Sequence, residues 1–193
     1  MTRAAALLVA LFMCGPAAAE DIVSVTTPLN LDKCRHKAGA AEEDYGAWRC
    51  RGYGHLRVFV SAGDQRTYIS YGRQAANEPA ARQTLAAFNG EGDTIEWRAV
   101  RGKDGKLKPF ATIVRFSVTK SAEEPPVKGA VLVVTRLGKP VCRVGYVDAL
   151  ANPDAEALAR RIADEHARMF QCQGSKPIFL GEKGPGFSGP YDE

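Results

Sequence analysis

Alternating apolar and polar residues predict a β-hairpin in the first half of the chain. Two short runs, residues 56–60 and 67–71, lie on either side of a Gly63-Asp64 pair. Side chains of a strand point to opposite faces in turn, so a period of two is typical of strands with one buried face. A Gly-Asp pair between two such runs favours a tight turn. We therefore expect an antiparallel pair of strands here.

A second, longer hairpin over residues 95–118 carries the strongest alternation in the chain. Its two arms flank a polar loop that contains Asp104-Gly105, a pair that favours a two-residue turn. This register collects the large apolar side chains on one face, so we expect Trp97 to be buried and Glu96 to face outward on the opposite side. The facing pairs that it predicts are Ile95 with Val114, Trp97 with Thr112, and Ala99 with Phe110.

Three further strands are predicted toward the carboxyl end. Residues 131–134 are all apolar, which is typical of a central strand that is covered on both faces. A turn at residues 138–140 leads back through residues 141–147. A last short strand covers residues 178–180.

Two segments change to the helical period. Residues 79–89 begin with a proline and place Ala81, Leu85 and Phe88 on one face, which predicts a short helix. The stronger helix signal covers residues 152–171, with an Asn-Pro start and carboxylates in the first turn. We predict Asn152 as the N-cap of this second helix. Its predicted apolar stripe consists of Ala155, Leu158, Ala159, Ile162, Ala163, His166, Met169 and Phe170.

These elements together predict an α+β fold, with an antiparallel sheet of about six strands, two helices and two disulfides. We expect residues 20–180 to form a single domain, in which residues 20–33 are an extended lead-in. Residues 181–193 are rich in glycine and proline, which indicates a flexible C-terminal tail.

Residues 1–19 have the layout of a cleavable signal peptide. A basic residue near the start precedes an apolar stretch too short to span a bilayer, and three alanines end at Ala19, before Glu20. One alternative is a buried N-terminal helix. Another is a lipoprotein anchored through Cys14, although the bulky Met13 fits lipoprotein processing poorly. We expect export through the signal peptide, to the periplasm.

The cysteine count agrees with export. Four cysteines follow Cys14, and an even number in an oxidising compartment indicates two disulfides, for which three connectivities exist. We favour Cys34–Cys50 and Cys142–Cys172, because each pair is close in sequence and brackets one local unit, the first a polar loop. The alternative, a zinc site, needs short Cys-x2-Cys spacings, which this chain lacks.

The net charge is mild. The chain carries +4, and loss of Arg3 with the signal peptide leaves one positive charge fewer. No run of Lys and Arg is dense enough to indicate a nucleic-acid-binding face, and no later segment is apolar for long enough to cross a membrane. We expect neither a nucleic-acid partner nor an integral membrane segment after signal cleavage.

Candidate catalytic residues are few, and each has a simpler interpretation. His36, His55 and His166 stand alone, without the His-x-x-x-His spacing of a metal site, and no cofactor motif is present. We interpret His166 as a packed helix residue and the other two as surface residues. Glu96 and Asp148 would suit a hydrolase if they flanked one cleft. Their alternative roles are an ion pair of Glu96 with Arg98 or Arg115 and a loop cap by Asp148.

The segment around the second cysteine is the best candidate for binding a partner. Trp48, Arg49, Arg51 and Tyr53 surround Cys50 within a few residues, and Trp, Tyr and Arg are enriched at interface hot spots. Its alternative role is a disulfide-pinned loop whose aromatic side chains cover the edge of a sheet.

Several short motifs also carry a resemblance. They are Cys34, Trp48-Arg49-Cys50-Arg51-Gly52-Tyr53-Gly54, Gly63-Asp64-Gln65-Arg66, Ile95-Glu96-Trp97-Arg98, Lys108-Pro109-Phe110-Ala111, Val147-Asp148-Ala149 and the stretch from Ala157 to Cys172. With these motifs, over most of the mature chain, the sequence resembles a family of small uncharacterised exported proteins of Gram-negative bacteria. The resemblance implies a periplasmic address and an oxidised four-cysteine framework, and brings no activity with it.

We therefore expect a periplasmic, non-enzymatic binding or interaction protein of the cell envelope, with an envelope protein or a cell-wall component as its partner. Two alternatives come from other classes. A small disulfide-bonded domain can inhibit a cell-wall hydrolase by inserting a rigid loop into its cleft. A carboxylate-dependent hydrolase would use Glu96 or Asp148.

Overall fold

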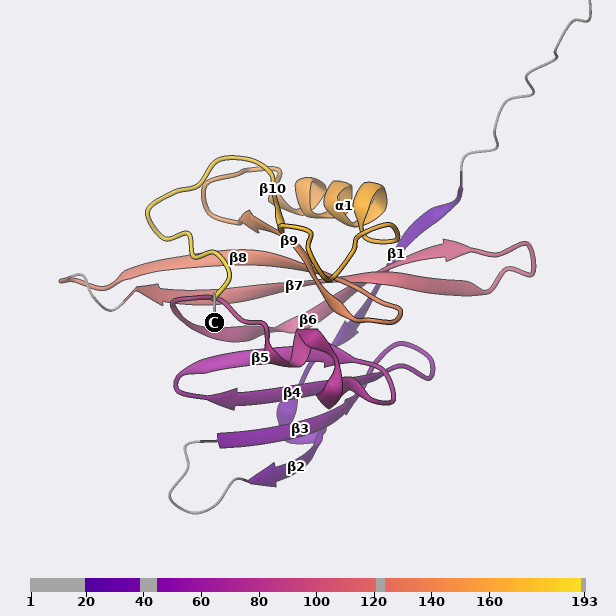
Figure 1. The fold of residues 1–193 in the computed structure, drawn as a ribbon, viewed down its shortest axis with the longest axis horizontal. Coiled ribbons are helices and arrows are strands. Elements are labelled where there is room, and N and C mark those ends of the chain that lie inside the picture. Colours follow the sequence, from indigo (N-terminus) through magenta and orange to yellow (C-terminus); the bar gives the residue numbers. More distant parts are fainter. Residues whose placement is uncertain (1–19, 39–44, 121–123, 192–193) are drawn as a thin grey trace, which may run out of the picture.

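The computed structural model describes residues 20–38, 45–120 and 124–191, which form two β-sheets and one α-helix (Figure 1). The larger sheet has six strands, and all neighbours in it are antiparallel except β9 and β10, which are parallel. In spatial order these strands are β1 (Ile22–Pro28), β6 (Phe88–Arg101), β7 (Leu107–Lys120), β8 (Val127–Arg136), β9 (Cys142–Asp148) and β10 (Ile178–Phe179).

The smaller sheet has four antiparallel strands in chain order. They are β2 (Arg35–Ala38), β3 (Tyr45–Arg51), β4 (Arg57–Gly63) and β5 (Arg66–Tyr71). Three short 3-10 turns accompany the sheets, and the helix follows β9. These elements are η1 (Leu31–Lys33), η2 (Ala75–Asn77), η3 (Pro79–Arg82) and α1 (Ala155–His166).

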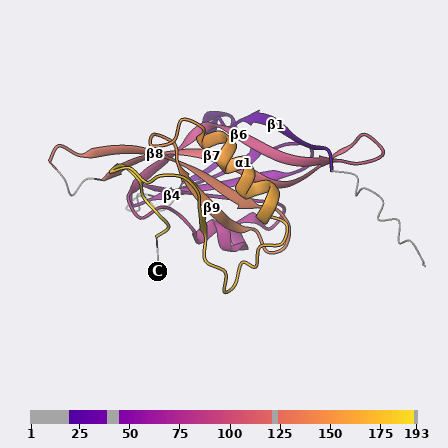
Figure 2. The same cartoon turned by 90° about the horizontal axis from the view of Figure 1, so that it is seen from above.

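The elements stack in three layers, with the large sheet between α1 and the small sheet. Figure 2 shows α1 lying across the large sheet. Strand β8 contacts both neighbouring layers: Val131 and Val133 belong to the core between the two sheets, whereas Leu132 and Val134 belong to the core under α1. The prediction of a central strand apolar on both faces is therefore confirmed. Among the described residues, no helix has the length and apolar character that a membrane span requires.

The long hairpin has the predicted register over most of its length. Ile95 faces Val114 and Trp97 faces Thr112, but a bulge after Arg98 shifts the pairing, so that Ala99 faces Pro109 and not Phe110. Trp97 is fully buried between the sheets, and its indole N–H donates to the Thr27 hydroxyl at 2.8 Å. Glu96 points to the opposite face as predicted, but it does not face solvent, because Arg160 of α1 covers it and its side chain is only 13% exposed.

The predicted helix over residues 79–89 is wrong. The chain there makes only the 3-10 turn η3, and β6 begins before the segment ends. The Thr84 hydroxyl donates to the Thr67 carbonyl at 2.7 Å, and the Asn89 side chain accepts from the Thr67 N–H at 3.1 Å. These bonds tie the segment to β5, so the helix-like spacing of its apolar residues reflects packing along a sheet. The fold has one α-helix where two were predicted.

The predicted single antiparallel sheet also needs correction. Residues 20–33 were expected as a lead-in, yet they contain β1, which extends the large sheet beyond β6. Residues 34–50, expected as a loop, contain β2 and all of β3 except its last residue. Strands β2 and β3 form a separate sheet with β4 and β5, so the protein has two sheets. The parallel pairing of β10 with β9 makes the larger sheet mixed. The α+β class stands.

The closing helix is present but shorter than predicted, and the roles of three residues were wrong. Asp154 and not Asn152 is the N-cap, because the Asn152 side chain donates instead to the carbonyls of Asp148 and Glu182. Met169 is 85% exposed and the His166 side chain is 43% exposed, so neither belongs to the buried stripe.

Both predicted disulfides are confirmed. Cys34 joins Cys50 within the small sheet, and Cys142 at the start of β9 joins Cys172 after α1. The predicted signal peptide, residues 1–19, lies outside the described residues.

The residues predicted as a flexible tail are described as far as residue 191, and they pack against both sheets. The Gly184 N–H donates to the Asp148 carboxylate at 2.8 Å, and the Ser188 hydroxyl accepts from the Ala87 N–H at 2.9 Å. Phe187 packs against the core between the sheets.

Candidate functional site

The outer face of the small sheet carries opposed arginines. In the antiparallel register Arg35 of β2 faces Arg49 of β3, and Arg51 of β3 faces Arg57 of β4. Directly opposed residues share one face, and these four lie on the face away from the core because the alternate position, Cys50, is buried. Like charges directly opposite one another destabilise a sheet. Two such pairs side by side therefore call for an explanation other than stability.

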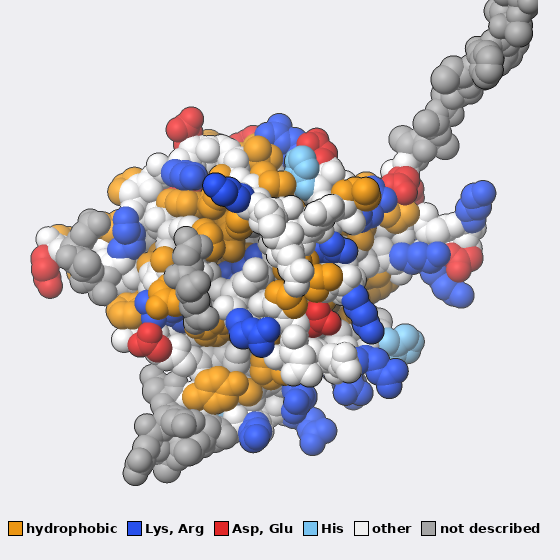
Figure 3. All heavy atoms as spheres, viewed as in Figure 1, with side chains coloured by type: hydrophobic (Ala, Val, Ile, Leu, Met, Phe, Trp, Pro, Cys, Tyr) orange, Lys and Arg blue, Asp and Glu red, His pale blue; other side chains and the backbone are white. Residues whose placement is uncertain are grey.

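These side chains line a cationic groove of about 960 Å³. None of the described residues that line it is acidic. Figure 3 shows Lys and Arg side chains gathered over the small sheet, at the lower right of the molecule. We call this site the cationic groove; its basic residues are Lys33, Arg35, Arg49, Arg51, Arg57 and Arg73, together with His55.

The basic side chains of the cationic groove have no carboxylate partner in the part of the chain that the structure describes. Within the described residues, none of the six Lys and Arg side chains forms an ion pair or a side-chain hydrogen bond. Arginines elsewhere behave differently, since six of them each bind a carboxylate. These pairs are Arg66–Asp64, Arg98–Asp164, Arg101–Asp21, Arg115–Glu156, Arg160–Glu96 and Arg168–Glu20. A concave surface with unpaired charges of one sign attracts oppositely charged ligands.

Local backbone features bring Arg73 and the loop before β4 to the cationic groove. Gly72 has a φ of +101°, a conformation that favours glycine, and it turns the chain at the end of β5. Its N–H donates to the Arg57 carbonyl at 2.9 Å, which holds the turn against β4. Gly52 lies against Trp97, where an added Cβ would come within 2.7 Å of the indole ring. A larger residue there would displace the loop that carries His55.

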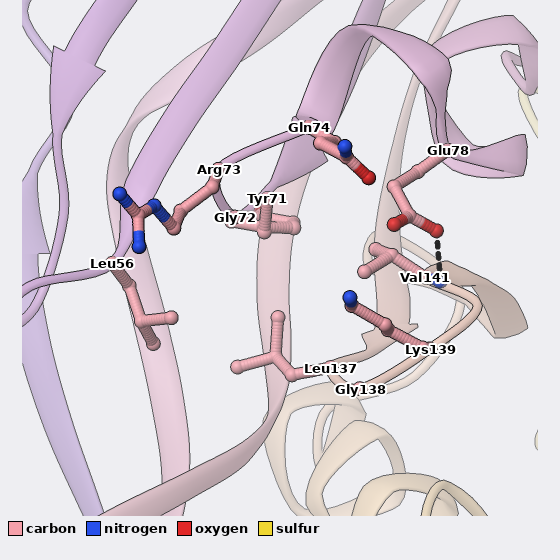
Figure 4. A pocket seen from close by; sticks show the side chains of 10 residues that line it. All are labelled: Leu56, Tyr71, Gly72, Arg73, Gln74, Glu78, Leu137, Gly138, Lys139 and Val141. Carbon is pink, nitrogen blue, oxygen red and sulfur yellow. Dashed lines mark hydrogen bonds between the residues drawn. The ribbon is translucent and has the colours of Figure 1, made fainter.

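An apolar pocket of about 640 Å³ adjoins the cationic groove (Figure 4). Its apolar wall consists of Leu56, Tyr71, Leu137 and Val141. Leu56 and Arg73 line both the pocket and the cationic groove, so the two hollows meet at these side chains. The combined site is apolar at one end and cationic at the other.

Tyr71 forms part of the pocket wall without exposing its ring. The side chain is 2% exposed and packs edge to face against Trp97, with the ring centroids 5.5 Å apart. Burial raises the pKa of the Tyr71 hydroxyl well above its ordinary value, because an ionised phenol would lose its hydration there. Tyr71 is therefore neutral at physiological pH and contributes an uncharged surface.

The far side of the pocket carries one acidic side chain and one basic one. Figure 4 shows Arg73 and Leu56 on one side, and Glu78 and Lys139 on the other. The Glu78 carboxylate accepts a hydrogen bond from the Val141 N–H at 2.9 Å, which fixes it against the backbone. The cationic end of the combined site is thus the end nearest Arg73.

The segment predicted for binding is divided between two faces of the small sheet. Arg49 and Arg51 line the cationic groove. Trp48 faces the other way, where it packs against the core and stacks on His36 with the ring centroids 4.8 Å apart. Tyr53 also packs against the core between the sheets. The residues of the site that the sequence did not single out are Lys33, Arg35, Arg57 and Arg73, and His55, interpreted from the sequence as a surface residue, also lines it.

The two candidate carboxylates lie outside the combined site. Glu96 accepts hydrogen bonds from the Arg160 guanidinium at 2.7 and 3.2 Å and lies 4.0 Å from Arg98. Asp148 is buried and accepts from the N–H groups of Leu150, Ala151 and Gly184. Each carboxylate thus has a structural role, Glu96 in an ion-pair network against α1 and Asp148 as a loop cap.

The comparisons with known proteins contribute no assignment. No model of a known protein family, no curated protein and no solved structure matches this chain. Within the described ranges, no group of three or more His, Cys, Asp or Glu side chains is arranged to hold a metal ion. The chemistry of the combined site therefore carries the functional proposal.

Proposed function

We propose that this protein is a non-enzymatic binding protein of the cell envelope, and that it holds an anionic ligand in the cationic groove. The observation that carries the proposal is the set of six Lys and Arg side chains around one hollow, unpaired within the described chain. Guanidinium groups bind phosphate and carboxylate groups through paired, charge-assisted hydrogen bonds. An anion here relieves the repulsion between the opposed arginines, so binding is favoured by both effects.

Two features support the location in the envelope. Both disulfides are of the kind that forms and persists in oxidising compartments such as the periplasm. The first residues of the chain also have the pattern of a secretory signal peptide. A binding role agrees with a site that offers unpaired positive charge, while Glu96 and Asp148 are occupied by structural partners.

The experiment measures binding of tripolyphosphate, a compact polyanion, by isothermal titration calorimetry at low salt. The Arg49→Ala/Arg57→Ala variant should weaken binding at least tenfold, since a hydrogen bond to a charged group contributes about 1.5–3 kcal/mol. The Arg82→Ala/Arg161→Ala variant removes the same charge at exposed positions outside the cationic groove, and it should bind within about twofold of the parent protein. Equal losses in the two variants, or no binding by the parent protein, would refute the proposal.

A further inference from the structure

The cationic groove is continuous with an apolar pocket, and this continuity restricts the class of ligand. A simple polyanion would use the charges and leave the pocket to water. A neutral apolar ligand would fill the pocket and leave the arginines unpaired. Only a molecule with an anionic head and an apolar chain satisfies both ends.

We infer that the ligand is a phosphorylated amphiphile, whose head group binds the arginines and whose hydrocarbon chain enters the apolar pocket. This inference rests on the proposed function, because the head group occupies the same cationic groove. It adds the chemical class of the ligand and the direction in which the ligand lies.

The head-group site is assigned by the arginines that line more than one hollow. Arg49, Arg57 and Arg73 line the cationic groove and also a smaller hollow of about 200 Å³ beside η2. Arg73 additionally lines the apolar pocket, so it marks the junction between charge and apolar surface. A phosphate group carries several acceptor oxygens, so it can bind three neighbouring guanidinium groups better than a single carboxylate can.

The chain site is assigned by the composition and size of the pocket. Leu56, Leu137, Val141 and the neutral Tyr71 form an apolar wall next to Arg73 (Figure 4). A volume of about 640 Å³ falls within the range that encloses small organic ligands. The side away from Arg73 carries Glu78 together with Lys139, so it has no net charge and attracts an anionic head group less than the Arg73 side does.

The orientation also agrees with the surroundings of the pocket. Arg143, the buried cation beyond Tyr71, does not line the pocket and packs over the Phe116 ring at 5.1 Å. The accessible positive charge at the pocket mouth on the β4 side is therefore that of Arg73 and its neighbours in the cationic groove.

The test measures the affinity of the exported protein for hexyl, octyl and decyl phosphate, each below its critical micelle concentration, with inorganic phosphate and tripolyphosphate for comparison. Each added methylene should tighten binding by about fourfold until the pocket is filled, which corresponds to about 0.8 kcal/mol per buried methylene. Decyl trimethylammonium, with the same chain and the opposite charge, should bind at least a hundredfold more weakly than decyl phosphate.

Variants separate the two ends of the site. Leu137→Asp should abolish the dependence on chain length and leave tripolyphosphate binding unchanged, and the uncharged Leu137→Gln serves as a second variant if the first fails to fold. Arg73→Ala should weaken all the phosphates, whereas Arg161→Ala on α1 should change none of them.

The outcomes distinguish the two proposals. Binding of tripolyphosphate with no dependence on alkyl chain length would overturn the amphiphile and leave the anion-binding function standing. Chain-dependent binding that is equal for decyl phosphate and decyl trimethylammonium would also overturn it. Failure of every phosphate to bind would refute the proposed function itself.

Discussion

At the residue scale, the positions that define the site differ in how far the sequence reveals them. Arg49 and Arg51 stand out beside a cysteine and two aromatic residues, and the structure places both in the cationic groove. Arg35 also follows a cysteine, Cys34, but its position in the cationic groove, like that of Arg57, follows only from strand pairing. A basic residue at every second position signals one face of a strand, but this signal is visible only once residues 34–50 are recognised as strands.

The buried Tyr71 makes stability depend on alkaline pH. Because burial raises the pKa of this phenol above its ordinary value of 10, the folded protein keeps Tyr71 neutral while the unfolded chain ionises it. The stabilisation that comes from this difference in pKa is therefore complete below pH 10, and it is lost as the pH rises above 10. Urea unfolding should be measured from about pH 8 to about pH 11. The free energy of unfolding should fall less over this range for Tyr71→Phe than for the parent protein. Equal losses would show that Tyr71 titrates normally.

Arg143 and Arg98 are both buried arginines with opposite environments. Arg98 donates to the Asp164 carboxylate at 2.9 and 2.6 Å, whereas Arg143 forms no ion pair with a carboxylate of the described residues and instead has Tyr146 and the Phe116 ring beside it. Burial lowers the pKa of Arg143, and Tyr146 beside it offsets part of this effect. Arg143→Met should therefore leave the free energy of unfolding unchanged or raise it, while Arg98→Met should lower it by about 1–3 kcal/mol. A loss at Arg143 as large as that at Arg98 would contradict this assignment.

At the element scale, periodicity predicts those elements whose faces are set by burial. The two hairpins β4–β5 and β6–β7, the central strand β8 and the helix α1 follow from it. The predicted helix over residues 79–89 fails because side-chain hydrogen bonds to β5 outweigh an accidental helical spacing. Strand β1 was missed because only one side of it is paired, its inward positions are only half-buried, and one of them is the polar Thr27, so the apolar alternation in the sequence is short.

The helix α1 gives a direct test of its assigned faces. On α1, the Ile162 side chain is fully buried against the large sheet, Leu158 is half-buried and Arg161 is exposed. Ile162→Ala should cost about 2–5 kcal/mol of unfolding free energy, and Leu158→Ala should cost less because less surface is removed from water. Arg161→Ala should stay within about 0.5 kcal/mol. Chemical denaturation of the three variants measures these changes. Equal losses of unfolding free energy for Arg161→Ala and Ile162→Ala would mean that the buried face of α1 has been assigned wrongly.

At the scale of the whole molecule, the candidate site and the helix lie in different layers. The cationic groove lies on the small sheet, while α1 covers the opposite face of the large sheet. The sequence predicts the class of fold and both disulfides, because these follow from local periods and cysteine spacing. It does not predict the combined site, because the basic residues come from segments around η1, β3, β4 and Gly72 that only the tertiary fold brings together.

The predicted signal peptide and the two disulfides together define an expected covalent state. Intact mass should correspond to cleavage before Glu20 and to a loss of about 4 Da, the four hydrogens released when two disulfides form. Alkylation under native conditions should add nothing, and alkylation after reduction should modify the four cysteines of the mature chain. A retained N-terminus would contradict the signal peptide, and four thiols reactive without reduction would contradict the disulfides.

The two disulfides should differ in their effect on ligand binding and agree in their effect on stability. Cys34–Cys50 lies beside the cationic groove, where Cys50 is one of the lining residues, whereas Cys142–Cys172 joins β9 to the chain after α1. Loop closure by either bridge contributes about 3–4 kcal/mol, so the Cys34→Ser/Cys50→Ser and Cys142→Ser/Cys172→Ser variants serve as matched controls.

Tripolyphosphate binding, measured under conditions where both variants are folded, should fall several-fold only in the first pair. Loss of the Cys34–Cys50 bridge frees η1 and β2, which carry Lys33 and Arg35, from their fixed position against β3. The free-energy cost of ordering η1 and β2 then reduces the free energy of binding. Equal weakening in both variants would mean that the binding surface depends on global stability, and unchanged binding in both would mean that Lys33 and Arg35 contribute nothing to it.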